Sequence, residues 1–587
     1  MADINLKING IDVTVPAGTT ILEAAHSIGI TIPTLCYLKD INEIGACRMC
    51  IVEANEGRGN RLVASCVYPV SEGMEVTTNS ARVVGSRKKT LELLLSDHDK
   101  SCLSCVRSGN CELQKLSKDL KVEDENTYEG STNDFEIDDS AAHMTRNNNK
   151  CILCRRCVAV CEKLQNVGVI GANERGFATN ISSPFGMGLG DTSCVSCGQC
   201  VAVCPTGALS EKDFTDDVLA AIADPEKFVI VQTAPAVRAS LGEAFGYPIG
   251  TDVEGKMAAA LRRMGFDKVF DTDFSADLTI MEEANELIER VSNGGTLPMI
   301  TSCSPGWIKF CEHYYPDLIP NLSTCKSPQQ MFGASAKTYY AEKIGVDPKN
   351  MVVVSVMPCI AKKFEIGRDD QSAAGVPDVD ISISTRELAR LIERLGIDFR
   401  SLPDEDFDAP LGMSTGAAVI FGATGGVMEA ALRTAVETLT GEELKNLDFV
   451  DVRGVEGIKE ASYEVAGLNV KVAVASGLKN ASILLDKVKA GEADYTFIEI
   501  MACPGGCVNG GGQIQQPASV RNFIDLRAER AKVLYNNDAN KPIRKSHENP
   551  AIKQIYEEYF GKPGSHRAHE VLHTSYVARG LNNYEFE

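Results

Sequence analysis

The cysteine pattern C-x2-C-x2-C-x3-C occurs twice, and it constrains the fold of this chain more than any other feature. The two copies are "CILCRRCVAVC" and "CVSCGQCVAVCP", beginning at Cys151 and Cys194, and the second ends in the proline typical of bacterial ferredoxins. In that pattern the fourth cysteine of each copy binds the other cluster. The sequence therefore predicts a domain with two [4Fe–4S] clusters. The predicted ligands are Cys151, Cys154, Cys157 and Cys204 for one cluster, and Cys194, Cys197, Cys200 and Cys161 for the other.

The chain contains 21 cysteines, an odd number, and most of them are tightly clustered. The N-terminal stretch "MADINLKINGIDVTVPAGTT" has neither a secretory pattern nor a twin arginine. Disulfides are therefore not expected to organise the fold, and metal ligation is the better interpretation.

The charge balance narrows the classes of partner. Lys plus Arg number 59 and Asp plus Glu number 80, which gives a formal charge of −21. This excess argues against a nucleic-acid or anionic-membrane partner, because like charges repel. No apolar run approaches the roughly 18 residues needed to cross a bilayer. We predict a soluble, cytoplasmic protein.

Residues 1–79 are predicted to form a β-grasp ferredoxin domain with a [2Fe–2S] cluster. Short β-type runs such as "IDVTVPAG" surround the piece "CYLKDINEIGACRMC", and a fourth cysteine follows it. Two thiolates two residues apart can bind one iron while distant ones complete the cluster. A zinc site is the alternative, but zinc more often shows paired C-x2-C knuckles. The predicted ligands are Cys36, Cys47, Cys50 and Cys66.

Residues 80–120 carry a second spacing, H-x3-C-x2-C-x5-C, after a helical stretch. One imidazole and three thiolates predict a [4Fe–4S] domain with mixed histidine and cysteine ligands, and the neutral imidazole tends to raise the reduction potential. The alternative is a solvated histidine at a helix end, favoured by the helix dipole. The three cysteines just beyond the histidine favour ligation. The predicted ligands are His98, Cys102, Cys105 and Cys111.

Residues 121–212 are predicted to join an acidic linker to the two-cluster domain, and the pattern changes at residue 213. Apolar strand-like runs such as "KFVIVQTA" and "MVVVSVM" then alternate with helical patterns such as "TRELARLIERLG". This alternation predicts α/β units with a largely parallel sheet. The fold class is thus multidomain, α+β followed by α/β.

Three of the predicted strands run directly into cysteines. "PMITSC" ends at Cys303, "VVSVMPC" at Cys359 and "FIEIMAC" at Cys503, with Cys507 shortly after. Sites in open α/β sheets form at the carboxyl ends of strands, so these four thiols are expected to meet. Buried structural thiols are the default alternative for any one of them.

The loops "TSCSPGW", "MPCIAKKFE" and "EIMACPGGCVNGGG" resemble the three signature loops of [FeFe]-hydrogenases. The N-terminal array resembles that of the multi-cluster clostridial type, so the resemblance covers nearly the whole chain. It implies that residues 213–525 hold an H-cluster, in which a [4Fe–4S] cubane is bridged by Cys507 to a two-iron subcluster carrying CO, cyanide and a dithiolate. The implied reaction interconverts H2 with protons and electrons.

One position departs from the family pattern. The family usually has two adjacent cysteines in the first loop, a proton carrier followed by a cubane ligand, and here the second position is Ser304. Either Ser304 occupies the ligand position, which an alkoxide fills poorly, or Cys303 is the ligand and the proton relay is altered.

The resemblance also implies roles for other residues. Lys362 would donate to a cyanide, and a proton path would lead outward from Cys303. For its charged members the alternative is a solvated helix face. Cys311 and Cys325 match no cluster and are interpreted as plain thiols. Expected pocket residues are Ala234, Pro235, Gln329, Met357 and Met501, and expected path residues are Glu283, Glu286, Arg290 and Ser323.

Residues 526–587 resemble the small subunit of this family and are expected to wrap the large domain as helices. The sequence shows no dinucleotide fingerprint, so a flavin or NAD(P) is expected on a partner subunit in a hetero-oligomer, with ferredoxin as the other electron partner. The alternatives are an electron-carrying iron–sulfur subunit resembling that of complex I, an assembly factor related to nuclear prelamin-A recognition proteins, and a hydrogen sensor.

Overall fold

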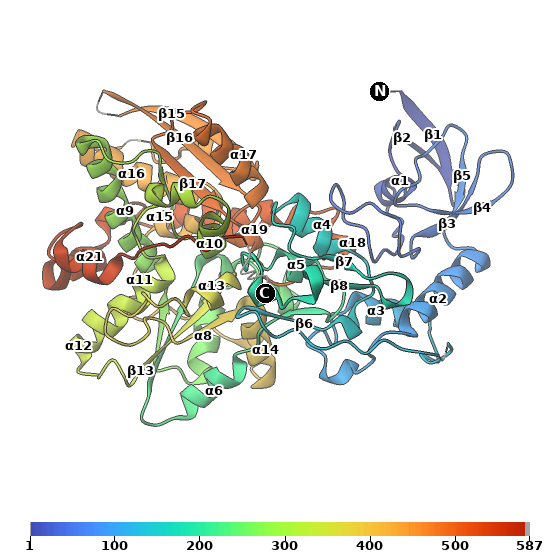
Figure 1. The fold of residues 1–587 in the computed structure, drawn as a ribbon, viewed down its shortest axis with the longest axis horizontal. Helices are drawn as coiled ribbons and strands as arrows, with labels where there is room; N and C mark the ends of the chain where they lie inside the picture. The colour runs from blue at the N-terminus through green and yellow to red at the C-terminus, as the bar shows by residue number, and fades with distance from the viewer. Residues whose placement is uncertain (1, 129, 445, 466, 582–587) are drawn as a thin grey trace.

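The computed structural model describes residues 2–128, 130–444, 446–465 and 467–581. The N-terminal sheet lies at one end of the molecule and a larger α/β region at the other, with the cysteine-rich segments between them (Figure 1). Within the described ranges, the helices lack the length and apolar character needed to span a bilayer. The predicted combination of α+β and α/β domains is confirmed.

The N-terminal domain is a sheet in the order β2-β1-β5-β3-β4 with helix α1 packed on it. β1 and β2 are antiparallel, and β1 is parallel to β5. Thr20 and Glu23 begin α1 with a reciprocal capping box, which supplies partners for free backbone N–H groups. The elements are β1 (Asp3–Ile8), β2 (Ile11–Pro16), α1 (Ile21–Ser27), β3 (Ile51–Asn55), β4 (Arg61–Ala64) and β5 (Glu75–Thr77).

The two copies of the repeated cysteine motif adopt the same backbone turn. Leu153 and Arg155 have φ of 53° and 60°, and Ser196 and Gly198 at the matching positions have φ of 60° and 71°. Each turn leads into a short helix, and the two helices pack together. Elements of this middle region are α2 (Ala81–Leu95), α3 (Glu112–Asp119), β6 (Met144–Arg146), α4 (Arg156–Lys163), β7 (Gly171–Asn173), β8 (Asn180–Ser182), α5 (Gln199–Val203) and β9 (Leu209–Glu211).

The described part of the α/β region contains two four-stranded sheets rather than one. The first, in the order β11-β10-β13-β14, is parallel throughout. The second, β12-β17-β16-β15, is parallel except for β15, which forms a hairpin with β16. The strands are β10 (Phe228–Thr233), β11 (Lys268–Asp271), β12 (Met299–Ile300), β13 (Met351–Met357), β14 (Ile381–Ser384), β15 (Ile458–Val465), β16 (Leu468–Ser476) and β17 (Phe497–Met501).

Helices pack around both sheets, and the longest described helix, α9, contacts α11, α15, α16 and α20. The helices of this region are α6 (Thr215–Ala223), α7 (Pro235–Arg238), α8 (Glu254–Met264), α9 (Asp273–Asn293), α10 (Pro305–Tyr314), α11 (Pro328–Ser335), α12 (Ala341–Ile344), α13 (Ala361–Glu365), α14 (Thr385–Arg394), α15 (Gly416–Val419), α16 (Gly426–Thr440), α17 (Leu478–Lys489) and α18 (Ala518–Arg521).

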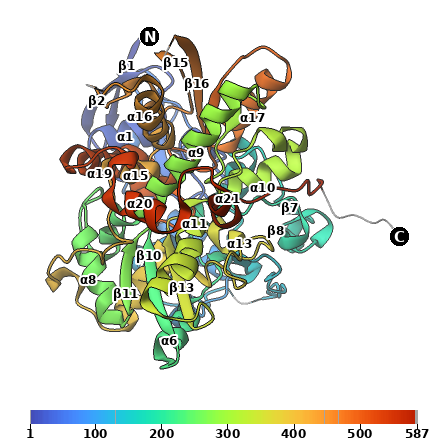
Figure 2. The same cartoon turned by 90° about the vertical axis from the view of Figure 1, so that its left-hand side faces the viewer.

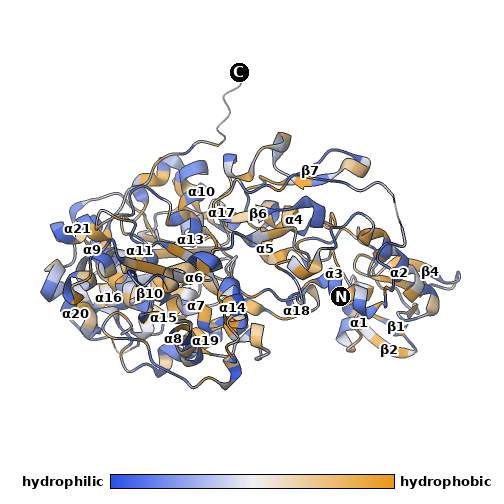
Figure 3. Cartoon of the chain, turned by 90° about the horizontal axis from the view of Figure 1, so that it is seen from below, coloured by the Kyte–Doolittle hydropathy of each residue, from blue (hydrophilic) through white to orange (hydrophobic). Residues whose placement is uncertain are grey.

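The C-terminal segment packs on the α/β region as helices. Helices α20 (Pro550–Ile555) and α21 (His566–Leu572) lie against α9 and α11, and α19 (Leu526–Asn540) lies against α15 (Figure 2). Ile552, Ile555 and Leu572 are buried in the same core as Phe270 and Phe332. Hydrophilic residues are frequent along α20 and α21, as expected for helices with one buried face (Figure 3).

Candidate active site

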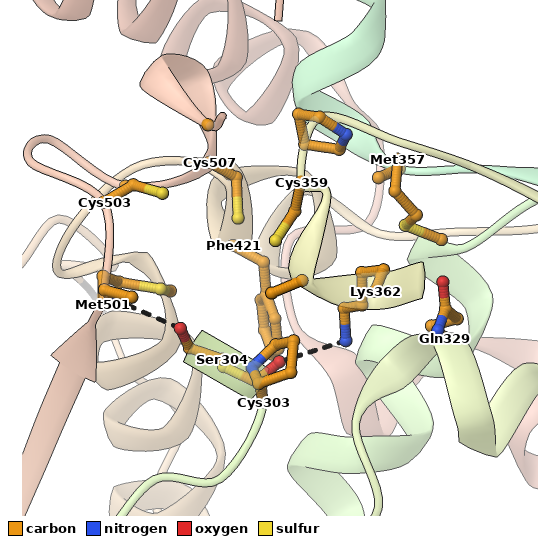
Figure 4. Close-up of a pocket in the computed structure, with 18 of the residues that line it drawn as sticks. Cys303, Ser304, Gln329, Met357, Cys359, Lys362, Phe421, Met501, Cys503 and Cys507 are labelled. Carbon is orange, nitrogen blue, oxygen red and sulfur yellow. Dashed lines mark hydrogen bonds between the residues drawn. The ribbon is translucent and has the colours of Figure 1, made fainter. Parts of the chain in front are cut away.

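A cavity at the carboxyl ends of β13 and β17 brings the four strand-end cysteines together. Cys303, Cys359, Cys503 and Cys507 all line it. In Figure 4 the side chains of Cys359, Cys503 and Cys507 enter from one side, and Cys303 and Ser304 lie across from them. Thiols from three distant segments of the chain therefore share one chamber.

The size and chemistry of the cavity fit a polynuclear iron–sulfur group. The cavity leaves about 820 Å³ free of protein atoms, part of it open to solvent. The centres of water-sized spheres can occupy about 80 Å³ of it, against roughly 10–15 Å³ for a site that holds one water, so the space exceeds what a single zinc ion needs. Several thiols together with apolar walls suit iron–sulfur ligation. Apolar lining residues include Ala234, Pro235, Met357, Phe421 and Met501.

Burial disfavours the thiolate form of these four cysteines. Desolvation is the main cause of a raised pKa at all four, and it raises the pKa of Cys507 to about 12. Lys362 works in the opposite direction, because its positive charge favours the thiolates of Cys359 and Cys507. Bound cations that compensate the thiolate charge would therefore replace the protons.

Glycines allow the loops around the cavity to approach one another closely. Gly506 has φ of 94°, and a Cβ there would lie 2.7 Å from the Thr424 nitrogen. A Cβ on Gly511 would lie 2.5 Å from the carbonyl oxygen of Cys197, which belongs to the ferredoxin-type motif and also lines the cavity. These contacts explain the "CPGGCVNGGG" composition and place the nearer ferredoxin-type centre against the active-site loops.

Cys303 and Ser304 occupy different environments within the first loop. The Ser304 hydroxyl oxygen accepts a hydrogen bond from the Ala502 N–H at 3.2 Å. The thiol of Cys303 lies near Glu283. Burial raises the pKa of Cys303 well above its ordinary value, and the negative charge of Glu283 is the next largest cause. Cys303 thus lines the cavity and lies close to Glu283.

Lys362 is buried beside the cavity and its charge is neutralised locally. Its ammonium donates to Glu365 Oε2 at 2.8 Å and to the Cys303 carbonyl at 3.2 Å. Glu365 Oε2 also accepts from Ser327 and from Gln329 Nε2 at 2.9 Å each. This network holds Lys362 and Gln329 at the wall of the cavity.

Glu283 is buried on α9, near a group of polar side chains that includes Glu286 and Ser323. Neither of its carboxyl oxygens has a hydrogen-bond partner among the described residues. Burial, and then the charge of Glu286, raises its pKa to about 8. The Ser323 hydroxyl donates to Glu286 Oε2 at 2.9 Å, and Arg290 Nη2 donates to Glu286 Oε1 at 2.6 Å. Glu283 is fully buried, so the alternative interpretation of a solvated, charged helix face does not hold for this residue.

The two ferredoxin-type cysteine sets gather in two separate cavities, each with the crossed-over set. One cavity is lined by the first three cysteines of one motif and the fourth cysteine of the other, and the second cavity has the complementary set. The sets are Cys151, Cys154, Cys157 and Cys204 in one, and Cys161, Cys194, Cys197 and Cys200 in the other.

The N-terminal cysteines lie in close pairs, and His98 is buried with one ring nitrogen lacking a partner among the described residues. Cys50 Sγ lies 3.3 Å from Cys66 Sγ, and the Cys47 N–H points to Cys36 Sγ at 3.5 Å. Burial lowers the pKa of His98 to about 4, and its Nδ1 has no partner among the described residues. A neutral, partly unpartnered imidazole is suited to bind a metal.

Both outer sites adjoin the same ferredoxin-type cysteines. The Asn42 side-chain amide donates to the carbonyl oxygens of Cys36 at 2.8 Å and Cys154 at 3.0 Å. In the His98 group, a Cβ on Gly207 would lie 2.5 Å from Cys105 Sγ. Gly207 follows closely on Cys204, so Cys105 lies beside the segment that lines the cavity of Cys154 and Cys204.

Sequence reasoning missed three residues of this arrangement. Glu365 is three residues after Lys362, which is the helical spacing for an ion pair and was a usable signal. Phe421 lies in "FGATGG", a stretch without metal-ligating side chains. Asn42 carries no local signal, because its two partners are far apart in the chain. Cys311 and Cys325 are fully buried, and Cys325 Sγ lies 3.9 Å from Glu286 Oε2.

Comparisons with known proteins agree with this geometry. Residues 227–511 match the C-terminal domain of the iron-only hydrogenase large subunit, and residues 524–579 match the iron hydrogenase small subunit. Residues 1–81 match a 2Fe-2S cluster binding domain, residues 87–126 an NADH-ubiquinone oxidoreductase-G iron-sulfur binding region, and residues 150–208 a 4Fe-4S dicluster domain.

Two relatives are similar to this chain over almost its whole length. The NADP-reducing hydrogenase subunit HndD of Solidesulfovibrio fructosivorans is 54% identical over 99% of this chain and 100% of its own length. Iron hydrogenase 1 of Clostridium pasteurianum is 45% identical over 97% of this chain and 99% of its own. The solved structure of a variant of apo [FeFe]-hydrogenase HydA1 from Chlamydomonas reinhardtii aligns with a TM-score of 0.57 and 44% identity, over 63% of this chain and 100% of that one.

The electron-carrier and assembly-factor alternatives are therefore disfavoured. The converging thiols, the upstream cluster sites and the full-length relatives lead to one conclusion: the chain belongs to the [FeFe]-hydrogenase family and is a multi-cluster iron hydrogenase.

Proposed function

We propose that this chain is the hydrogen-converting subunit of a hetero-oligomer that exchanges electrons with NAD(P) through a flavin-containing partner, with ferredoxin, or with both. The relative HndD is named as a subunit of an NADP-reducing hydrogenase, which supports an assembly of this kind. The described residues offer cysteine-lined cavities, and the sequence has no glycine-rich nucleotide fingerprint, so the nucleotide site belongs to a partner. We place the assembly in the cytoplasm.

The single observation that carries the active-site assignment is the convergence of Cys303, Cys359, Cys503 and Cys507 on one apolar cavity. Cys359, Cys503 and Cys507 would hold the cubane of an H-cluster, and Cys507 would also bridge to the two-iron part. When bound, the H-cluster supplies the Lewis-acidic iron and the base that split H2. Lys362 would orient a cyanide by donation, with Glu365 balancing its charge.

For the first loop, we propose that Ser304 occupies the fourth cubane position and that Cys303 carries protons. Cys303 lies near Glu283, whereas Ser304 Oγ lies at the cavity wall and accepts from the Ala502 N–H. The serine oxygen would bind iron less well than a thiolate, because iron in such clusters prefers softer sulfur ligands.

Protons would move between Cys303 and solvent along α9. The proposed order is Cys303, Glu283, Ser323, Glu286 and Arg290, which runs from the cavity toward the partly exposed Arg290. Glu283 suits this role because its pKa of about 8 lets it hold and release a proton near neutral pH.

Electrons would leave through the accessory centres. We propose one [2Fe–2S] and three accessory [4Fe–4S] clusters at the four cysteine and histidine sets described above. The set with Cys197 lies nearest the active site, and the set with Cys154 lies beyond it. Because Asn42 and Gly207 bring both outer sites to that second set, two surface sites can exchange electrons with the same inner centre.

The test is infrared spectroscopy of the matured enzyme together with iron analysis. Bands from metal-bound CO and cyanide, with H2-dependent reduction of a viologen dye, are expected. Full maturation without these bands would exclude the H-cluster and return the chain to an electron-carrying or assembly role. Reduction of NAD(P) only after the partner subunits are added would support the proposed assembly.

A further inference from the structure

Next to the proton path, one carboxylate, one thiol and one imidazole converge. Ligand atoms of Glu286, Cys325 and His573 all lie within 4.8 Å of one another. Oxygen, sulfur and nitrogen donors of these kinds bind Zn²⁺ at about 2.0–2.3 Å, which puts the ligands of a tetrahedral site roughly 3.3–3.8 Å apart. Closing the three atoms around one ion therefore requires shifts of about 1 Å. We infer that Glu286, Cys325 and His573 form a binding site for Zn²⁺ or a similar transition-metal cation, and that an ion bound there closes the proton path.

Backbone hydrogen bonds between distant segments hold two of the three candidate ligands close together. Glu286 is on α9, Cys325 is in the loop before α11, and His573 follows α21. Cys325 and His573 are paired in an antiparallel bridge. The Lys326 N–H donates to the Leu572 carbonyl, and the Thr574 N–H to the Thr324 carbonyl, each at 2.8 Å. The thiol and imidazole are thus held together before any ion binds.

The local charge favours a cation. The carboxylate of Glu282 lies 3.2 Å from His573 Nε2, so a second carboxylate borders the site. Burial, and then the charges of Glu286, Glu283 and Glu282, raise the pKa of the Cys325 thiol, so three carboxylates lie near it. Arg290 is the opposing charge, because it pairs with Glu286 Oε1 at 2.6 Å.

The site is buried but close to the surface. Side chains of Glu286 and His573 are 13% and 7% exposed, and Cys325 is fully buried. The exposed ring of His569 lies 4.0 Å from that of His573. An ion could enter past His569, with water or that imidazole completing its coordination.

Binding would interrupt proton transfer because Glu286 cannot serve both purposes. Its Oε2 now accepts from the Ser323 hydroxyl at 2.9 Å and from the Thr324 N–H at 3.1 Å, and its Oε1 pairs with Arg290. A cation on the carboxylate would displace one or more of these donors. The inhibitory consequence rests on the proton path proposed above, whereas the binding itself does not.

The experiment titrates the matured holoenzyme with ZnCl2 while H2 production is measured, with MgCl2 in parallel because Mg²⁺ disfavours sulfur and nitrogen ligands. Zinc K-edge X-ray absorption reports the ligands independently of activity. Cys325→Ala and His573→Gln test the site, and Cys311→Ala is the control for a buried thiol elsewhere.

Zn²⁺ but not Mg²⁺ should inhibit the wild-type enzyme and the Cys311→Ala variant. Each site variant should raise the half-inhibiting Zn²⁺ concentration at least tenfold, and Cys325→Ala should remove one sulfur neighbour from the zinc spectrum. Infrared bands and iron content should not change. Equal inhibition of all variants, or a zinc spectrum unaffected by Cys325→Ala, would overturn the site. If the zinc spectrum shows one sulfur ligand but H2 production is not inhibited, the metal site is supported and the proton path through Glu286 is refuted.

Discussion

Replacing Glu283 with Gln tests the proton path most directly. The amide has nearly the shape of the carboxyl group, but it cannot release a proton at any working pH. Glu283 is fully buried, and neither carboxyl oxygen has a well-formed hydrogen bond among the described residues, although the Ser323 hydroxyl and the Ser302 N–H lie close enough to lower its pKa. Because Gln keeps the size of the side chain, a loss of turnover with intact infrared bands would report proton transfer rather than a broken contact.

The size of the effect follows from the raised pKa. At pH 7 a carboxyl group with a pKa of about 8 is mostly protonated, so it can donate a proton and be reprotonated within a small pH range. Removing a positioned acid–base group typically slows a reaction by roughly 10²–10⁴-fold. We expect H2 production by Glu283→Gln to fall within that range.

The same pKa has a consequence for stability. The carboxyl pKa rises from 4.5 to about 8 on folding, so the folded state binds more protons between these values and stability falls as the pH rises through them. At pH 7 the linkage cost is about 3 kcal/mol. Glu283→Gln should remove this part of the pH dependence, as measured by urea unfolding between pH 5 and pH 8.

The assay compares H2 production from a reduced viologen dye with infrared spectra of the same samples. Glu289→Gln is the matched control, because Glu289 is exposed on the same helix. The expected result is intact CO and cyanide bands with turnover lost in Glu283→Gln only. Turnover within threefold of wild type, with unchanged bands, would show that protons do not pass through Glu283.

Three further variants test the cofactor sites. Ser304→Cys should tighten iron binding at the cubane and lower its reduction potential, which Mössbauer spectra and redox titration would show; identical spectra would remove Ser304 from the ligand set. His98→Ala should abolish one accessory cluster signal in electron paramagnetic resonance while H2/D2 exchange continues, and a full complement of signals would refute ligation by His98. Gly511→Ala should cost about 1–3 kcal/mol, because its Cβ would lie 2.5 Å from the Cys197 oxygen, and a thermal shift of less than 1 °C would contradict that contact.

Many of the candidate metal ligands could be predicted from the spacing of cysteines within short segments of the sequence. The crossed ferredoxin-type sets follow from the doubled motif, because each motif forms one turn and one short helix whose geometry depends on near neighbours. The strand-to-cysteine junctions at Cys359 and Cys503 were equally local, since an apolar run and the thiol that follows it are adjacent in sequence.

The separation of the α/β region into two sheets could not be predicted from local sequence patterns. Strand order depends on pairing between segments such as β12 and β17, which lie far apart along the chain. The roles of Glu365 and Asn42 depend in the same way on partners supplied by other elements.

The sequence by itself determined which atoms are available to bind metal and in which short turns they lie. Only the tertiary structure decided that Glu283 is buried, that Cys303 lies close to it, and that Cys325 and His573 lie beside Glu286. The physical reason is that ligand spacing is a property of a few bonded residues. Burial, charge environment and the meeting of distant side chains are set by the packing of the whole chain.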